Sequence, residues 1–234
     1  MSLQEILYED NHIIIVNKRS SDIVQGDKTG DIPLSEIVKQ YIKEKYNKPG
    51  EVFMGVVHRI DRPVSGAVIF ARTSKALARL NKMISERQIH KKYWAVTARI
   101  PDPEKGHLTH YLVKNQKKNM SFASCEPGEG RLKAELEYRY LASSDRYHLL
   151  EVELLTGRHH QIRVQLSAIG CVIKGDLKYG AARSNKNASI HLHAREISFT
   201  HPVKNNLISI VAPLPDDPLW KHFEKVLGGK PAMP

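Results

Sequence analysis

Runs of apolar residues recur along the chain and predict its strands. HIIIV (residues 12–16) and AVIFA (67–71) are apolar at consecutive positions, which is typical of short strands buried on both faces. YHLLEVELL (147–155) alternates in polarity instead, as a strand does when only one of its faces is buried. Further strands are predicted at residues 93–98, 131–142, 191–199 and 207–213.

Apolar residues at helical spacing predict four helices. One follows Pro33, with apolar side chains at i, i+3, i+4, i+7 and i+8, and proline suits its first turn. A second begins near Ser74, whose hydroxyl is a suitable N-cap. A third lies between Gly157 and Gly170, and the last opens at residues 217–218.

The predicted elements indicate an α+β fold. Strands outnumber helices, and several strands are joined by loops too short for the crossover that parallel strands need. We therefore expect a mixed, largely antiparallel sheet with flanking helices. The chain has 234 residues and shows no repeat, linker or low-complexity tract, so we expect residues 1–234 to form a single domain. A monomer is expected because no spare apolar stripe is visible.

The excess of basic residues says more about possible binding partners than the rest of the composition does. Lys and Arg number 36 against 25 Asp and Glu, and a net charge of +11 attracts polyanions, of which nucleic acid is the usual one. A solvated lysine surface would also fit that count. No apolar run approaches the roughly 20 residues that span a bilayer, and the first residues lack a signal-peptide pattern. Because Cys125 and Cys171 are isolated, we expect a reducing, cytoplasmic setting without structural disulfides.

Candidate chemistry begins in HRIDR, where one carboxylate, Asp61, stands among His58, Arg59 and Arg62. The segment comes directly before the apolar run 67–71, so Asp61 is expected on a loop held by a buried strand. Catalytic groups concentrate on loops of that kind. A surface aspartate in a cluster of ion pairs is the simpler interpretation, and this segment alone favours it.

Two further segments carry candidate side chains. In GRHHQIRVQ, Arg158 lies at a turn, and Arg163 follows the core-facing Ile162 near the start of a helix. A partly buried arginine needs an anion, either a carboxylate or a phosphate, although a solvent-facing arginine in a first helical turn is common. Tyr93 follows two lysines. A strand tyrosine usually lies in the core or at its rim, and only the basic flank suggests a stacked base.

The 12 histidines raise the alternative of a metal hydrolase. His191 and His193 are two apart and so share one face of a strand, and His159, His160 and His201 could join them. No Asp or Glu accompanies them at a familiar ligand spacing, and histidines more often line a core or lie at the surface. We therefore expect neither a metal nor another cofactor.

HRIDRPVSG resembles the HRLDRxTSG signature of the RluA-type pseudouridine synthases. Other segments match that family in the same order from about residue 5 to 213, and several motifs in register are specific where one would be weak. They are EILYEDNHIIIVNK, KKYWAV, LLTGRHHQIRVQLSAIGCVIKGD and HLHAREISFTHP. The chain departs from the family pattern at Arg19, Ile60, Val64, His159 and Gln165. We expect a member without the small RNA-binding domain that often precedes the catalytic one, which leaves the RNA open.

The resemblance implies an isomerase that turns uridine in structured RNA into pseudouridine, within a central RNA-binding cleft and without metal or cofactor. By resemblance Asp61 is the catalytic aspartate, either as nucleophile or as a charge that stabilises a sugar intermediate. Tyr93 would lie against the uracil, Arg163 would pair with Asp61, and Arg59 would help to displace the target base. The remaining substrate contacts are expected from His58, Arg62, Lys91, Arg158 and Gln161.

The expected partner is ribosomal or transfer RNA, with no membrane and no DNA. A non-catalytic RNA-binding protein is the alternative, and a net charge of +11 would suffice for it. That alternative leaves the combination of Asp61, Tyr93 and Arg163 without a purpose.

Overall fold

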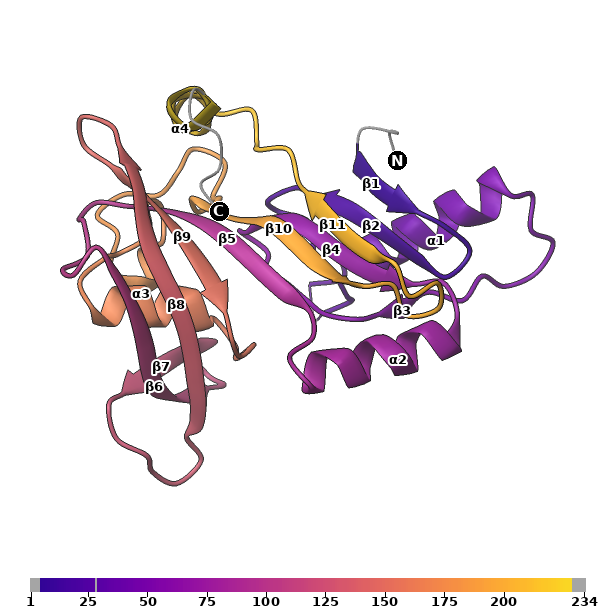
Figure 1. The fold of residues 1–234 in the computed structure, drawn as a ribbon, viewed down its shortest axis with the longest axis horizontal. Helices are drawn as coiled ribbons and strands as arrows, with labels where there is room; N and C mark the ends of the chain where they lie inside the picture. Colours follow the sequence, from indigo (N-terminus) through magenta and orange to yellow (C-terminus); the bar gives the residue numbers. More distant parts are fainter. Residues whose placement is uncertain (1–4, 28, 229–234) are drawn as a thin grey trace. The chain divides into compact units, whose positions relative to one another are not determined.

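The computed structural model describes residues 5–27 and 29–228, which form two compact units (Figure 1). The first unit takes the described residues up to Lys91 together with Ala194–Pro213. The second takes Lys92–His193 and the described residues from Leu214 onward. Each unit combines segments far apart in the sequence, and each has its own core. That the two act as a single catalytic domain stays a prediction.

The first unit is built on a sheet in which β2 lies between β1 and β4 (Figure 1). Strands β1 and β2 pair antiparallel, as do β2 and β4, β3 and β4, and β10 and β11. The elements of this unit are β1 (Ile6–Glu9), β2 (Ile13–Lys18), α1 (Leu34–Lys45), β3 (Gly55–Val56), β4 (Ser65–Ala71), α2 (Ser74–Ser85), most of β10 (Leu192–Thr200) and β11 (Leu207–Val211).

Strand β4 is the centre of this unit, and every one of its residues is buried. Its neighbours in the sheet are β2 and β10, and helix α2 adds Ala76 and Leu80 to the same core. Gly66 is required here because its φ is +116° and a Cβ would lie 2.3 Å from the carbonyl oxygen of Ala194. The consecutive apolar run that predicted this strand reflects burial on both faces.

The cap of helix α2 differs from the prediction. Thr73, not Ser74, is the N-cap, and its Oγ1 accepts a hydrogen bond of 3.1 Å from the backbone N–H of Ala76. Ser74 is the first helical residue. Both side chains are able to cap, and the extended backbone of Thr73 (φ −140°, ψ 150°) decides between them.

The second unit is an antiparallel sheet in the order β5-β9-β8-β6-β7. Helix α4 packs on it through Trp220 and Phe223, which contact Val96 and Leu149. Helix α3 adds Val164 to a second cluster with Leu112. The elements are β5 (His90–Thr97), which starts in the first unit, β6 (Lys105–Asn115), β7 (Met120–Ser124), β8 (Leu132–Ser143), β9 (His148–Leu154), α3 (Gln161–Ala168), a 3₁₀ turn (Leu177–Tyr179) and α4 (Pro218–Gly228).

The expected α+β class, with a largely antiparallel sheet and flanking helices, is confirmed. The four predicted helices are present among the described residues as α1 to α4. The hairpin of β6 and β7 was not predicted. Across residues 5–27 and 29–228, no helix has both the length and the apolar character needed to cross a membrane.

Candidate functional site

The HRIDR segment leads directly into the buried strand β4. Residues 62 and 63 form a turn, closed by a hydrogen bond of 3.0 Å from the backbone N–H of Val64 to the carbonyl oxygen of Asp61. Strand β4 begins at the next residue, Ser65. Asp61 is half-buried and lies at the turn that leads into the most completely buried strand of the unit. A rigid base of this kind suits a group that has to be positioned accurately.

A buried lysine, Lys18, holds this turn from beneath. It is only 1% exposed, and its Nζ donates to the carbonyl oxygens of Arg62, Asp22 and Arg19 at 3.1, 2.8 and 2.9 Å. Burial lowers the pKa of Lys18 to about 7, against the opposing charges of Asp22 and Asp61. Lys18 was not predicted as a site residue. The available signal was a lysine at the end of a strand whose first four residues are apolar.

The other predicted contacts of the first unit divide into fixed and exposed side chains. His58 Nε2 accepts a hydrogen bond of 3.1 Å from the backbone N–H of Ile69, which ties the imidazole to β4. Burial, aided by the charge of Lys91, lowers the pKa of His58 to about 3, so the ring is neutral at physiological pH. Burial also lowers the pKa of Lys91. Arg59 is exposed. Their contacts with a substrate stay predictions.

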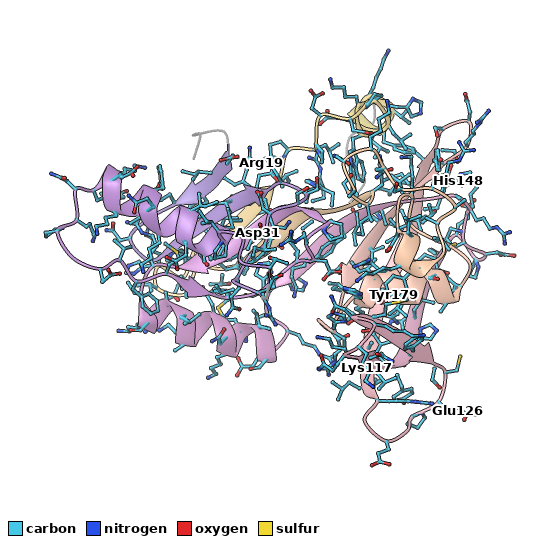
Figure 2. All side chains as sticks on the ribbon, turned by 180° about the vertical axis from the view of Figure 1, so that it is seen from behind. Arg19, Asp31, Lys117, Glu126, His148 and Tyr179 are labelled. Atoms are coloured by element: carbon cyan, nitrogen blue, oxygen red, sulfur yellow. The ribbon has the colours of Figure 1, made fainter. Side chains whose placement is uncertain are left out.

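Arg62 is held at both ends. Its carbonyl oxygen accepts hydrogen bonds from the backbone N–H of Ser21 and from Lys18. Its guanidinium reaches the loop that precedes α1, where Nη2 donates to Asp31 Oδ2 at 2.6 Å and to Thr29 Oγ1 at 2.9 Å. Asp31 is labelled in Figure 2. The side chain of the predicted substrate contact Arg62 thus has carboxylate and hydroxyl partners within its own unit.

In the second unit, Gln161 builds the turn that starts α3. Its Oε1 accepts hydrogen bonds from Thr156 Oγ1 at 2.8 Å and from the backbone N–H of Arg158 at 2.9 Å. Its Nε2 donates to the carbonyl oxygen of Glu135, and only 3% of the residue is exposed. Arg158 is exposed at the same turn, and its Nε donates to the carbonyl oxygen of Lys133. These contacts hold Gln161 within the turn, and the substrate contacts of Gln161 and Arg158 stay predictions.

Arg163 is buried and has the anion that its burial requires. Nε and Nη2 donate to the two carboxylate oxygens of Asp176 at 2.7 and 2.8 Å, and Arg163 and Asp176 are 4% and 1% exposed. The guanidinium carbon also lies 5.1 Å from the ring centre of Tyr179, which is labelled in Figure 2. A pairing of Arg163 with Asp61 would join the two units, and it stays a prediction.

Asp176 and Tyr179 are the residues of this cluster that the sequence analysis missed. Tyr179 Oη accepts a hydrogen bond of 2.8 Å from the backbone N–H of Ser121 and lies 2.9 Å from His160 Nδ1. Asp176 ends the KGD segment, and its sequence signal is the place of that segment in the block that resembles the family.

Tyr93 lies in β5 opposite Val152 of β9 and is 6% exposed.

The histidines that suggested a metal site have other partners. His191 Nε2 lies 3.1 Å from Asp217 Oδ1, and its ring stacks on Trp220. His201 Nδ1 accepts the backbone N–H groups of Val203 and Lys204. Within the described part of the chain, no three or more His, Cys, Asp or Glu residues gather as a ligand set. His191 therefore contacts the residue that precedes α4, and His201 stabilises a turn.

Exposed basic residues lie at the tip of the β6–β7 hairpin. Lys117 and Lys118 are exposed in the turn, which is closed by a hydrogen bond of 2.9 Å from the backbone N–H of Lys118 to Asn115 Oδ1. Lys117 marks this tip in Figure 2. Lysines placed in this way suit contacts with phosphates.

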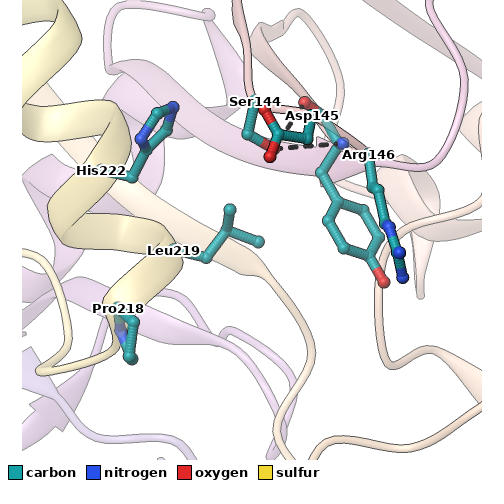
Figure 3. A pocket seen from close by; sticks show the side chains of 7 residues that line it. Ser144, Asp145, Arg146, Pro218, Leu219 and His222 are labelled. Carbon is teal, nitrogen blue, oxygen red and sulfur yellow. Dashed lines mark hydrogen bonds between the residues drawn. The ribbon is translucent and has the colours of Figure 1, made fainter.

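A shallow hollow of about 370 Å³ lies between the β8–β9 turn and α4 (Figure 3). It contains none of the predicted site residues. The side chains around it belong to Ser144, Asp145, Arg146, Tyr147, Pro218, Leu219 and His222. Its walls are the outer surface of a helix-docking contact, so this hollow is not a candidate catalytic cavity.

Comparison with known proteins identifies the family. The family model described as RNA pseudouridylate synthase matches residues 12–168. The chain is 30% identical to Ribosomal large subunit pseudouridine synthase D of Zymomonas mobilis, over 91% of this chain and 70% of that protein. It is 31% identical to Ribosomal large subunit pseudouridine synthase C of Buchnera aphidicola, over 96% of this chain and 71% of that protein.

A solved structure agrees with these sequence matches at the level of the fold. Human RNA Pseudouridylate Synthase Domain Containing 4 superposes with a TM-score of 0.78 at 23% identity, over 96% of this chain and 93% of that one. The residues that suggested the resemblance fall largely within the matched range. The chain belongs to the RNA pseudouridylate synthase family, and it is an isomerase that acts on RNA.

Proposed function

We propose that this protein converts uridine to pseudouridine in ribosomal RNA, with Asp61 as its catalytic aspartate. The observation that carries the assignment of Asp61 is its position at the turn that leads into the buried strand β4, a turn held by Lys18. Ribosomal RNA is supported by the names of two relatives, both of which are ribosomal large subunit synthases. Transfer RNA is the alternative substrate.

The reaction asks for one well-placed carboxylate. Pseudouridine forms when the bond from C1′ to N1 of uracil breaks, the base turns, and C1′ bonds to C5. The proton on C5 leaves and N1 gains one, so the mass is unchanged. Glycosidases that use water need two carboxyl groups, whereas here no water has to be activated and Asp61 alone suffices. It acts either as the nucleophile or as the charge that stabilises the sugar cation.

In this proposal a positive charge of the first unit stabilises the Asp61 carboxylate. A closing RNA surface removes water from the carboxylate, which costs free energy unless a cation is nearby. The ammonium of Lys18 is close enough to Asp61 to interact with it electrostatically and offsets part of that cost. The role first given to Arg163 alone is therefore shared with Lys18, whose place beneath the turn is fixed by three carbonyl oxygens.

The second unit supplies a rigid scaffold in the same proposal. Arg163 is held in one orientation by both oxygens of Asp176 and by the ring of Tyr179, so it does not have to be ordered when RNA binds. Tyr93 contributes a ring against the uracil and a hydroxyl that takes part in proton transfer. The exposed Arg59 helps to displace the target base, which must leave its stack before it can react.

RNA is bound mainly through phosphates, with Lys117 and Lys118 among the contacts. We further propose that the protein works as a monomer in the cytoplasm. The isolated, free cysteines Cys125 and Cys171 support a reducing compartment.

The test is an assay of the purified protein on separate RNA preparations in EDTA. In vitro transcribed large-subunit ribosomal RNA and total unmodified transfer RNA are each incubated with the protein and digested to nucleosides. We expect a product that has the mass of uridine but the chromatographic position of pseudouridine, formed from ribosomal RNA. Product from transfer RNA alone would contradict the proposed substrate, and no product from either would contradict the assigned reaction.

A further inference from the structure

The loop of residues 25–27 and 29–32, here called the acidic loop, is fixed at its base, and these described residues are exposed. Backbone hydrogen bonds from Leu34 to Ile23 (2.7 Å) and from Ser35 to Val24 (3.2 Å) close the base. Gly26 and Gly30 have no other atom within 4 Å of the place a Cβ would take, and Gly30 has a φ of +79°. At these two glycines the backbone is unpacked and has wide conformational freedom, while the base of the loop is held by hydrogen bonds.

Three side chains of the acidic loop, those of Asp27, Thr29 and Asp31, converge on Arg62. Asp31 Oδ2 is 2.6 Å from Arg62 Nη2, and Asp27 Oδ2 is 3.9 Å from the same nitrogen. Thr29 Oγ1 accepts a hydrogen bond from Arg62, and its one proton faces two acceptors, Asp27 Oδ1 and, at 3.1 Å, Asp31 Oδ2. The guanidinium lowers the pKa of the Asp31 carboxyl, so Asp31 is ionised at physiological pH. Two carboxylates and a hydroxyl thus share one cationic group.

The backbone of Arg62 is held in place, whereas its side chain can exchange one hydrogen-bond partner for another. Its backbone is pinned by Lys18 and Ser21, and it directly follows Asp61 in the chain. Its side chain is nevertheless 39% exposed. A phosphate accepts hydrogen bonds from the same pair of guanidinium N–H donors as a carboxylate does. Exposed ion pairs are weak, so a phosphate that arrives beside Asp61 can replace Asp31 without a large loss.

We propose that the acidic loop is a displaceable cover of Arg62, whose guanidinium passes from Asp31 and Asp27 to a backbone phosphate when RNA binds. The inference rests on the proposed function, in which Asp61 is the catalytic aspartate and RNA is bound mainly through its phosphates. The cover reserves a strong phosphate site next to the catalytic aspartate for polyanions that also engage the rest of the surface. A small anion that displaced Asp31 would gain no contacts with the rest of the surface, so it would be bound less tightly than a polyanion.

Removing the cover should tighten RNA binding. Asp31→Asn keeps the shape of the side chain and removes its charge, so we expect the Kd for a fluorescein-labelled RNA hairpin to fall about two- to fivefold. Asp27→Asn should give a smaller gain, because Asp27 lies farther from Arg62 (3.9 Å). The matched control is Glu51→Gln, which removes an exposed carboxylate paired with Lys39 in the same unit and should leave the Kd unchanged.

Two further variants separate a cover from a general charge effect. Thr29→Val removes the hydroxyl that bridges Arg62 and Asp31 without a change in net charge, and it should also tighten binding. In an Arg62→Gln background, Asp31→Asn should bring no gain. The inference is overturned if Asp31→Asn helps equally in that background, if Thr29→Val leaves the Kd unchanged, or if Asp31→Asn weakens binding.

Thermal unfolding of each variant checks that the fold is kept, and Thr29→Val provides the answer should Arg62→Gln not fold. Pseudouridine formation by the unaltered protein is measured in parallel. If that activity is present while the cover variants behave as neutral, only the cover is wrong. If the unaltered protein neither binds nor converts RNA, the proposed function fails, and the cover fails with it.

Discussion

Two arginine–aspartate pairs of nearly equal length, one in each unit, lie in opposite environments. Arg62 Nη2 and Asp31 Oδ2 are 2.6 Å apart, with side chains 39% and 58% exposed. Arg163 Nε and Asp176 Oδ2 are 2.7 Å apart, with side chains 4% and 1% exposed. Distance therefore does not distinguish the two pairs, whereas burial does. The exposed pair is weak and exchangeable, and the buried one cannot lose a partner without leaving a charge out of water.

The largest effect is expected from breaking the buried pair. Arg163→Ala leaves the carboxylate of Asp176 buried and unpaired, so the free energy of unfolding should fall by about 3–5 kcal/mol and most activity should be lost. Urea unfolding followed by circular dichroism measures the first quantity. The matched control is Asp31→Asn in the exposed pair, which should change stability by no more than about 0.5 kcal/mol. Equal losses in the two variants would contradict the comparison.

Double-mutant cycles show which acid Arg163 depends on. Arg163→Ala combined with Asp176→Asn should cost less stability than the sum of the single variants, because the two side chains share both hydrogen bonds. The same cycle with Asp61→Asn tests the predicted pairing between Arg163 and Asp61. A coupling with Asp61 that exceeds the coupling with Asp176 would overturn the assignment of Asp176 as the main partner.

Tyr93→Phe tests the other largely buried side chain that is predicted to meet the substrate. The ring and its packing in β5 are kept, and only the hydroxyl is lost. If that hydroxyl moves a proton during re-attachment, the single-turnover rate should drop by about 10²–10⁴-fold. Tyr140→Phe is the control, since its hydroxyl contacts Ser143 at an exposed position. A near-normal rate for Tyr93→Phe would reduce Tyr93 to a stacking surface.

Lys18→Met removes the buried charge beneath the Asp61 turn. Three carbonyl oxygens lose a donor, so stability should fall by about 1–3 kcal/mol at neutral pH, and conversion should slow as the turn loosens. The pKa of Lys18 is about 7 in the folded protein and higher in the unfolded chain, so the unfolded state binds more protons between these values.

A pH series of the same variant checks the sign of this effect. The contribution of Lys18 to the free energy of unfolding should increase as pH rises from 7 toward 10. The difference in stability between the unaltered protein and Lys18→Met should therefore widen over that range. A constant difference would show that Lys18 has an ordinary pKa, and the charge assigned to it beneath Asp61 would then be permanent.

The smallest effect is expected at the exposed hairpin tip. The double substitution of Lys117→Ala and Lys118→Ala should weaken RNA binding several-fold. The slope of log Kd against log salt should fall by the amount expected for about two phosphate contacts. The rate at which bound RNA is converted should change little. Lys221, exposed on α4 and paired with Asp216, provides the control substitution. Unchanged salt dependence in the hairpin variant would make these lysines an ordinary solvated surface.

The sequence predicted the elements whose residues must be buried. It did not predict the features that depend on backbone conformation or on which residues the fold brings together. The runs at residues 12–16 and 67–71 became buried strands because strands covered on both faces must be apolar. The strands β6 and β7 are partly exposed and carry polar residues, so their sequence has no comparable periodic signal. At the start of α2, Thr73 and Ser74 have the same chemistry, and only backbone conformation separates them.

The candidate site shows the same division. A need for an anion at Arg163 could be predicted from its place beside a core-facing residue, and the anion exists. Its identity could not be predicted, because Asp176 lies 13 positions away and is brought near only by the fold. Lys18 was missed for a related reason: a lysine at a strand end is usually exposed, whereas here Arg62, Asp22 and Arg19 bring carbonyl oxygens to it.

The most direct test of the account compares Asp61→Asn with Asp145→Asn, an exposed acid on the β8–β9 turn, in RNA binding and in conversion. Asp61→Asn keeps the size of the side chain and removes the charge that the reaction needs. We expect it to abolish pseudouridine formation while its Kd for RNA stays within a few-fold of the unaltered protein, and we expect Asp145→Asn to behave normally in both assays. Pseudouridine made by purified Asp61→Asn would contradict the central claim.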